Sequence, residues 1–167
     1  RRGRWSSKPT RLKELICVNP DFRDLLQVFN EKGVKYLVIG GYAVIKHAEP
    51  RFTKDLDVWV SPDEENALRV YESLAEYGAP LFDLQPRDFA DKGFFYTIGV
   101  APSRIDILFE LKGVDSESAW MRRVAGHLGD IPVLFIGRDD LIQNKETVGR
   151  LQDLADVEKL RDTDPNK

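Results

Sequence analysis

Two short stretches of the chain carry residue types and spacings that suit phosphate chemistry. Asp55 and Asp57 lie two positions apart in an apolar run, and on a β-strand such residues share one face, about 6–7 Å apart. Neighbouring carboxylates repel each other unless a cation lies between them. Hard oxygen ligands at this spacing suit Mg²⁺ or Mn²⁺. The pair therefore predicts a divalent metal site completed by water and substrate phosphates.

A third carboxylate, Asp106, lies in the run 104–109, where isoleucines flank it on both sides. Their alternation sends the apolar side chains to the core and leaves Asp106 on the opposite face. If this strand lies beside the one with Asp55 and Asp57, three carboxylates converge. Such a group holds two metal ions and offers a base near an incoming hydroxyl.

Gly40 and Gly41 follow the apolar run 36–39 and precede a short helical stretch at 42–47. Glycines let a phosphate approach the backbone, and the N–H groups at a helix start favour an anion. A plain tight turn explains the pair equally well, and Asp-x-Asp also occurs on ordinary exposed strands. The order of strand, Gly-Gly, helix, Asp-x-Asp strand and later strand Asp is more specific than any one part.

Five further side chains have a functional interpretation, a structural one, or both. Lys145 lies near the buried stripe of its helix, so its ammonium either binds a phosphate or snorkels to the surface. Arg51 either contacts a phosphate or is a solvated loop residue, and Thr53 shares the face of the first aspartate, beside the metals. Arg150 and Asp153, three residues apart, are expected to form a salt bridge; the alternatives for Asp153 are that it caps the last helix or holds Lys145 in place.

The remaining candidates favour structural roles. His47 and His127 have no partner at metal-ligand spacing, and Cys17 has no evident activating neighbour. The run 120–123 combines an aromatic with basic groups as RNA binders do, although an amphipathic helix covering the sheet also explains it.

The elements that must position these residues alternate between helix and strand. Helices are expected from Asn19 and Pro20 to Gly33, at 42–47, from a capping box at 61–64 to Gly78, at 116–124, and over 139–161 with a break at Gly149. Strands are expected at 36–39, 55–60 and 131–136, with an antiparallel hairpin formed by 94–99 and 104–109. This order predicts an α/β (α+β) fold with a mixed, partly antiparallel sheet flanked by helices.

Composition limits the classes of protein that remain. The chain has 167 residues, 42% hydrophobic and 32% charged, with a net charge of −3, which is typical of a globular protein and unlike one that coats nucleic acid. One cysteine and no membrane-length apolar run indicate a cytoplasmic protein without membrane contact. Residues 1–18 are expected to be a basic, flexible tail that either reaches nucleic-acid phosphates or stays solvated, and residues 19–163 a single domain.

These motifs resemble the nucleotidyltransferase superfamily that includes DNA polymerase beta. The nearer resemblance is to small prokaryotic nucleotidyltransferases of the abortive-infection toxin type, through Gly40-Gly41-x-Ala43, Arg51-x-Thr53-x-Asp55-x-Asp57 and the segment 140–157. By that resemblance the chain has the nucleotidyltransferase fold. Gly40 and Gly41 hold the triphosphate, Asp55, Asp57 and Asp106 bind metal, and Thr53 and Lys145 lie near the nucleotide.

The function implied is transfer of a nucleoside monophosphate from a nucleoside triphosphate, such as ATP, to an acceptor hydroxyl with release of pyrophosphate and use of Mg²⁺ or Mn²⁺. The acceptor stays open among tRNA or another RNA, a protein and a small molecule. The toxin-type resemblance also implies an antitoxin-like protein partner. Two other functions remain: a non-catalytic nucleotide- or partner-binding module, and a metal-dependent phosphodiesterase.

Overall fold

A computed structural model describes residues 18–163 of the chain. The predictions for the basic tail and for Cys17 concern residues 1–17 and lie outside the described residues. The helices are α1 (Pro20–Glu31), α2 (Gly40–His47), α3 (Glu64–Tyr77), the 3₁₀-helix η1 (Pro86–Ala90), α4 (Ser116–Met121), α5 (Arg138–Val148) and α6 (Leu151–Asp162). The strands are β1 (Tyr36–Ile39), β2 (Leu56–Val60), β3 (Phe95–Ile98), β4 (Ile105–Leu108), β5 (Val124–Leu128) and β6 (Ile131–Phe135).

The strands form one six-stranded mixed sheet in the order β3-β4-β2-β1-β6-β5. The pairs β1–β2, β3–β4 and β5–β6 are antiparallel, whereas β2–β4 and β1–β6 are parallel. The predicted mixed, partly antiparallel sheet is therefore confirmed. The strand with Asp57 lies directly beside the strand with Asp106.

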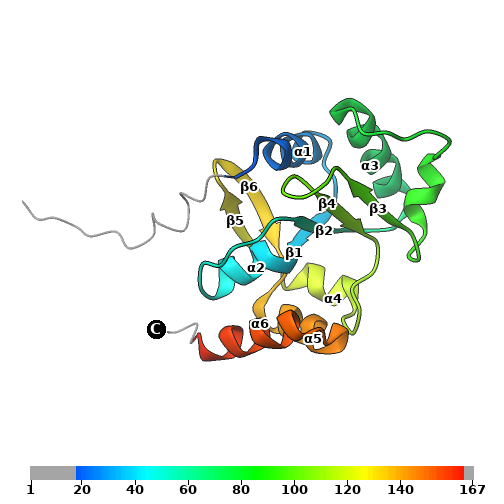
Figure 1. Ribbon diagram of the computed structural model, residues 1–167. Helices are drawn as coiled ribbons and strands as arrows, with labels where there is room; N and C mark the ends of the chain where they lie inside the picture. The colour runs from blue at the N-terminus through cyan, green and yellow to red at the C-terminus, as the bar shows by residue number, and fades with distance from the viewer. Residues whose placement is uncertain (1–17, 164–167) are drawn as a thin grey trace, which may run out of the picture.

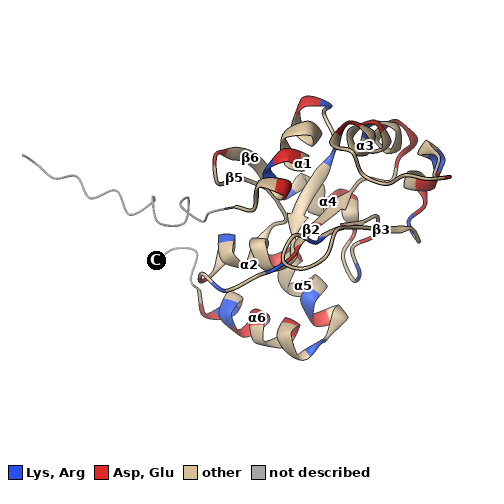
Figure 2. Cartoon of the chain, turned by 45° about the horizontal axis from the view of Figure 1, so that its top comes forward, with Lys and Arg blue, Asp and Glu red and all other residues tan. Residues whose placement is uncertain are grey.

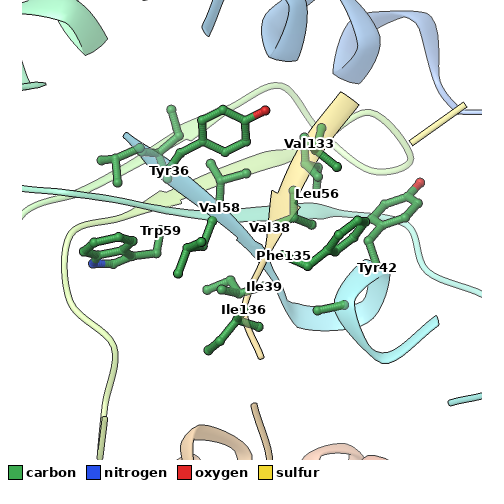
Figure 3. Packing of buried hydrophobic residues seen from close by; sticks show 14 of the residues in the cluster. Tyr36, Val38, Ile39, Tyr42, Leu56, Val58, Trp59, Val133, Phe135 and Ile136 are labelled. Atoms are coloured by element: carbon green, nitrogen blue, oxygen red, sulfur yellow. The ribbon is translucent and has the colours of Figure 1, made fainter. Parts of the chain in front are cut away.

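Helices cover both faces of the sheet, with α1 and α3 on one side and α5 and α6 on the other (Figure 1). The central strand β1 is buried along its whole length, as its continuous apolar run predicts. Figure 3 shows Tyr36 and Val133 on the opposite side of the strands from Trp59 and Ile136, so both faces are packed. Packing on both faces holds the inner strands in place, and these strands carry the carboxylates.

Most predicted elements are present, and their ends follow the expected signals. Asn19 caps α1 by accepting a hydrogen bond from the Asp21 backbone N–H. The left-handed backbone of Gly78 ends α3, and that of Gly149 separates α5 from α6. The hairpin of β3 and β4 is also confirmed.

Two local predictions are wrong. Asp63, not Ser61, is the N-cap of α3: its carboxylate accepts from the Asn66 N–H, and Ser61 Oγ donates to Asp63. The helix predicted over 116–124 ends at Met121, and Val124 begins the strand β5, which we did not predict. Its sequence, Val-Ala-Gly-His-Leu, is a weak strand former, and pairing with β6 stabilises it.

Among the described residues, no helix is both long and apolar enough to cross a membrane.

Candidate active site

The residues predicted to carry the chemistry line one cleft of about 510 Å³ near the start of β2, between the sheet, α2 and α6. They share this cleft with basic and acidic side chains from three other segments. Its wall includes Gly40, Gly41, Arg51, Thr53, Asp55, Asp57, Arg104, Asp106, Lys145, Arg150, Asp153 and Asp156. A larger hollow of about 790 Å³ lies over β5 and β6, but none of the three carboxylates lines it.

The three aspartates come together because β2 and β4 are parallel neighbours. Asp57 and Asp106 are direct partners in the register, and Asp55 immediately precedes β2. Asp106 is only 6% exposed. Its Oδ1 accepts hydrogen bonds from Thr97 Oγ1 and from Arg104 Nε, both at 2.9 Å. The position of Asp106 is therefore fixed by Thr97 on β3 and by Arg104, which immediately precedes β4.

Electrostatics single out Asp57 among the three. The pKa of Asp57 is raised to about 6, mainly by burial and also by the nearby charges of Asp106 and Asp55, while Lys145 and Arg150 oppose the shift. The ionised form of Asp57 is thus held at a cost in the folded chain. A cation placed among the carboxylates relieves that cost.

A divalent metal ion fits some features of this donor set. Among residues 18–163, no three His, Cys, Asp or Glu side chains are grouped closely enough to form a metal site. The guanidinium of Arg104 already pairs with Asp106. However, Asp55 Oδ1 is buried and accepts no hydrogen bond within the same residues. A buried carboxylate oxygen without a donor is the kind of group that a hard cation satisfies.

The absence of a side chain at Gly40 leaves room for the carboxylate of Asp57. Its φ of 63° is left-handed, and a Cβ at this position would lie 2.9 Å from Asp57 Cγ and closer still to its Oδ2. The strand-to-helix turn thus brings the backbone directly against Asp57. The first turn of α2, including Gly40 and Gly41, lines the cleft with the N-terminal end of the helix dipole.

Gly40→Ala is expected to destabilise the protein by about 2–4 kcal/mol, because left-handed backbone is unfavourable for alanine and the methyl group displaces Asp57. Urea unfolding measures this loss. Gly33→Ala is the matched control: Gly33 is also left-handed, with φ 68°, but a Cβ there meets no atom within 4 Å. Equal losses in the two variants would show that contact with Asp57 does not matter.

Gly41 makes room for the loop that follows α2. A Cβ on Gly41 would lie 2.5 Å from Thr53 Oγ1 and 3.1 Å from an Arg51 nitrogen. Thr53 donates a hydrogen bond to the Asp55 backbone oxygen at 3.3 Å. Both predicted loop residues therefore pack between the start of α2 and the segment that carries Asp55 and Asp57.

A network of charged side chains, buried or half-buried except for Arg150, lines the cleft on the α6 side. Lys145, 5% exposed, pairs with Asp153 at 3.2 Å and with Asp156 at 2.9 Å. Arg51 pairs with Asp156 at 3.1 Å, and Arg150 with Asp153 at 2.8 Å. Figure 2 shows charges of both signs along α5 and α6.

This network decides several of the open alternatives. The Arg150–Asp153 salt bridge is confirmed. Lys145 does not snorkel to the surface, since its ammonium lies buried between two carboxylates. The solvated-loop interpretation of Arg51 is wrong, because its guanidinium pairs with the fully buried Asp156. Both cations still line the cleft, so a phosphate contact stays a prediction.

The sequence matches no known family model and no curated protein. Among solved structures it is similar to the lincomycin-bound lincosamide antibiotic adenylyltransferase LnuA, with 13% identity and a TM-score of 0.56. The likeness covers 88% of this chain and 98% of that one. The chain therefore shares the overall fold of that adenylyltransferase. The narrower toxin-type resemblance gains no support from this match and stays a prediction.

Sequence reasoning missed two residues of this cleft. Asp156 follows Asp153 by three positions on α6, so its place on the same helix face was visible, but its partner Arg51 comes from a distant loop. Arg104 precedes Asp106 by two, and this spacing puts both on one strand face. That periodicity is the signal that identifies it.

The structural roles predicted outside the cleft have partners in the fold. His47 Nε2 lies 2.7 Å from the Ile136 backbone oxygen. Trp120 packs between two cations, with Lys35 Nζ 5.0 Å and Arg123 Cζ 4.3 Å from its ring. Trp120 and Arg123 of the aromatic-basic run thus contact each other within the fold, although the helix expected to hold this run ends at Met121.

Proposed function

We propose that the protein transfers a nucleoside monophosphate from a nucleoside triphosphate to an acceptor hydroxyl. The observation that carries this proposal is the register pairing of Asp57 with Asp106, with Asp55 and the start of α2 on the same cleft. The fold shared with LnuA supports it.

The phosphates of the substrate are placed at the start of α2. The helix N-terminus favours negative charge there, and the basic groups of Lys145 and Arg150 line the same wall. Lys145 is held in place by its two aspartates. The protein therefore contributes position and charge, which are the main requirements of phosphoryl chemistry.

The acceptor hydroxyl is placed next to Asp106. Its oxygen forms the new bond to the α-phosphorus as the bond to the departing pyrophosphate breaks, and its proton passes to a carboxylate. Asp106 suits this role because Thr97 and Arg104 hold its Oδ1, whereas its Oδ2 accepts no hydrogen bond among residues 18–163. Asp106 is therefore oriented for the transfer without being fully engaged.

Asp55 and Asp57 are the residues that would hold Mg²⁺ or Mn²⁺, with Asp106 as a third ligand. When bound, the ion neutralises charge that develops on the phosphorus oxygens and lowers the pKa of the attacking group. Removal of the mutual repulsion at Asp57 favours its binding.

The acceptor is proposed first as a hydroxylated small molecule. LnuA, similar over 98% of its own length, is a lincosamide adenylyltransferase, and the described residues form no further layer outside the sheet and its flanking helices. RNA, a protein or an antitoxin-like partner remain alternatives to be tested by the same experiment.

Incubation with each labelled nucleoside triphosphate, with Mg²⁺ or Mn²⁺, tests the proposal against three acceptor pools: hydroxylated small molecules including lincosamides, total RNA, and lysate protein. Label on an acceptor with an equal amount of pyrophosphate is the expected result. Nucleotide binding without transfer to any pool would indicate a non-catalytic module. Cleavage of a phosphodiester without incorporation would indicate a phosphodiesterase.

A further inference from the structure

The cleft has a second arm whose chemistry differs from that of the carboxylate end. This apolar arm has a volume of about 460 Å³ and lies between β3, β4 and α5. It continues from the cleft that holds the three aspartates, which we call the polar cleft. The two share one wall, which includes Gly40, Asp57, Lys145 and Arg150. The hydrophobic part of its remaining surface includes Ile39, Phe94, Phe95, Leu108, Leu111 and Val148, and the polar part consists of Lys92, Glu110, Lys112 and Asn144.

The floor of the apolar arm is the same face of the sheet that carries the aspartates. Leu108 follows Asp106 by two positions on β4, and Phe95 on the edge strand β3 is its direct partner in the register. Phe95 is 52% exposed, although its strand neighbour Tyr96 is buried. An aromatic ring is thus presented in the cleft beside the carboxylates.

A hydrogen bond between α5 and the loop after β4 also stabilises the walls of the apolar arm. Asn144 on α5 donates from its Nδ2 to the backbone oxygen of Lys112 at 2.9 Å, which ties the 110–112 loop to the helix. The Oδ1 of Asn144 accepts no hydrogen bond within the described part of the chain and remains an acceptor in the arm. An apolar pocket with a few fixed polar groups is the usual form of a small-molecule site.

We propose that the apolar arm binds the nucleoside of the nucleoside triphosphate, with the base against Phe95. The phosphates then lie on the shared wall, at the start of α2 and near Lys145 and Arg150. Every base has an aromatic face that stacks on such a ring, and Asn144 offers an acceptor to its N–H groups. This inference rests on the function proposed above.

If the nucleoside occupies the apolar arm, the acceptor binds in the polar cleft. Of the three aspartates, only Asp57 lines the apolar arm, whereas Asp55 and Asp106 line the polar cleft alone. A nucleoside in the apolar arm leaves the acceptor hydroxyl free access to Asp106. The two substrates thus reach the α-phosphorus from different sides.

Calorimetry with Mg²⁺ compares inorganic tripolyphosphate with ATP, GTP, CTP and UTP, because tripolyphosphate probes the shared wall without the apolar arm. We expect wild type to bind at least one nucleotide tighter than tripolyphosphate. Phe95→Ala should weaken that nucleotide about 10-fold, as loss of one stacking contact does, and leave tripolyphosphate unchanged. Val148→Trp, which fills the arm from the end of α5, should have the same effect. Phe82→Ala is the control, since Phe82 is 90% exposed and lines neither arm.

The outcomes separate the inference from the proposed function. If tripolyphosphate binds wild type but no nucleotide binds tighter, or if both variants keep wild-type nucleotide affinity, the apolar arm does not hold the nucleoside and the transfer proposal stands. Should neither tripolyphosphate nor any nucleotide bind wild type, the proposed function fails and the inference fails with it. Circular dichroism confirms that each variant is folded.

Discussion

Replacing Asp57 with Asn is expected to lower nucleotidyl transfer at least about 100-fold while making the nucleotide-free protein more stable at pH 7. Activity falls because a lost ligand misplaces the metal that stabilises the transition state. Stability rises because Asn keeps the shape of the side chain and removes a buried charge that Asp106 and Asp55 repel. Functional sites often retain such a conflict at the expense of stability.

The gain in stability should depend on pH in a defined direction. The folded-state pKa of Asp57 is raised from 3.8 to about 6, so the folded protein binds this proton more tightly than the unfolded chain. The wild type therefore loses stability as the pH rises from about 4 to about 6, and the variant does not. A shift of this size corresponds to about 2–3 kcal/mol at pH 7, and the two proteins should converge below pH 4.

Urea unfolding of both proteins at pH 4, 5, 6 and 7, without metal or nucleotide, measures this difference. Thermal melts with Mg²⁺ and a nucleoside triphosphate supply the functional readout, since a ligand that binds only the folded state raises the melting temperature. The wild type should shift upward far more than Asp57→Asn. A variant that is less stable than wild type at pH 7 and keeps the full ligand shift would assign Asp57 to structure rather than to the site.

Much of this site could be predicted because its parts have strong local signals. The period of two on a strand puts Asp55 and Asp57 together, and the strand-glycine-helix order marks the start of α2. The convergence of Asp106 depended on one unknown, the placement of β4 beside β2, which the local pattern does not specify. The structure supplies that pairing.

Other features were hidden because their partners are far away in the sequence. The strand β5 has weak propensity and is stabilised by its hairpin with β6, for which the Gly-Asp pair at 129–130 was the available signal. Arg51 looked like a solvated loop residue because nothing near it in sequence reveals Asp156. Burial of charge depends on the tertiary structure, and it also changes the stability effect expected when Lys145 is replaced.

Replacing Lys145 with Ala is expected to destabilise the protein by about 3 kcal/mol, which is much more than a surface lysine contributes. Removing one member of a buried ion pair leaves uncompensated charge and typically costs about 3–5 kcal/mol. Here Arg150 still pairs with Asp153, and Arg51 and Gln152 still contact Asp156, so the lower end applies. Urea unfolding measures the loss, and Lys159→Ala, a half-buried lysine on α6, should cost less than about 0.5 kcal/mol.

The double variant Lys145→Met with Asp156→Asn separates charge from packing. It removes one positive and one negative group from the same contact and should recover at least half of the loss seen in Lys145→Ala, because the one partner carboxylate that remains, Asp153, is still paired with Arg150 and the network keeps its wild-type net charge. Lys145→Met alone is the control for packing, because methionine keeps most of the carbon chain: if it recovers as much as the double variant, Lys145 stabilises the fold through that chain rather than through Asp156. Tripolyphosphate affinity, measured where each variant is folded, tests the proposed phosphate contact independently: an unchanged affinity in Lys145→Ala would leave Lys145 as a residue that only closes the cleft through α6.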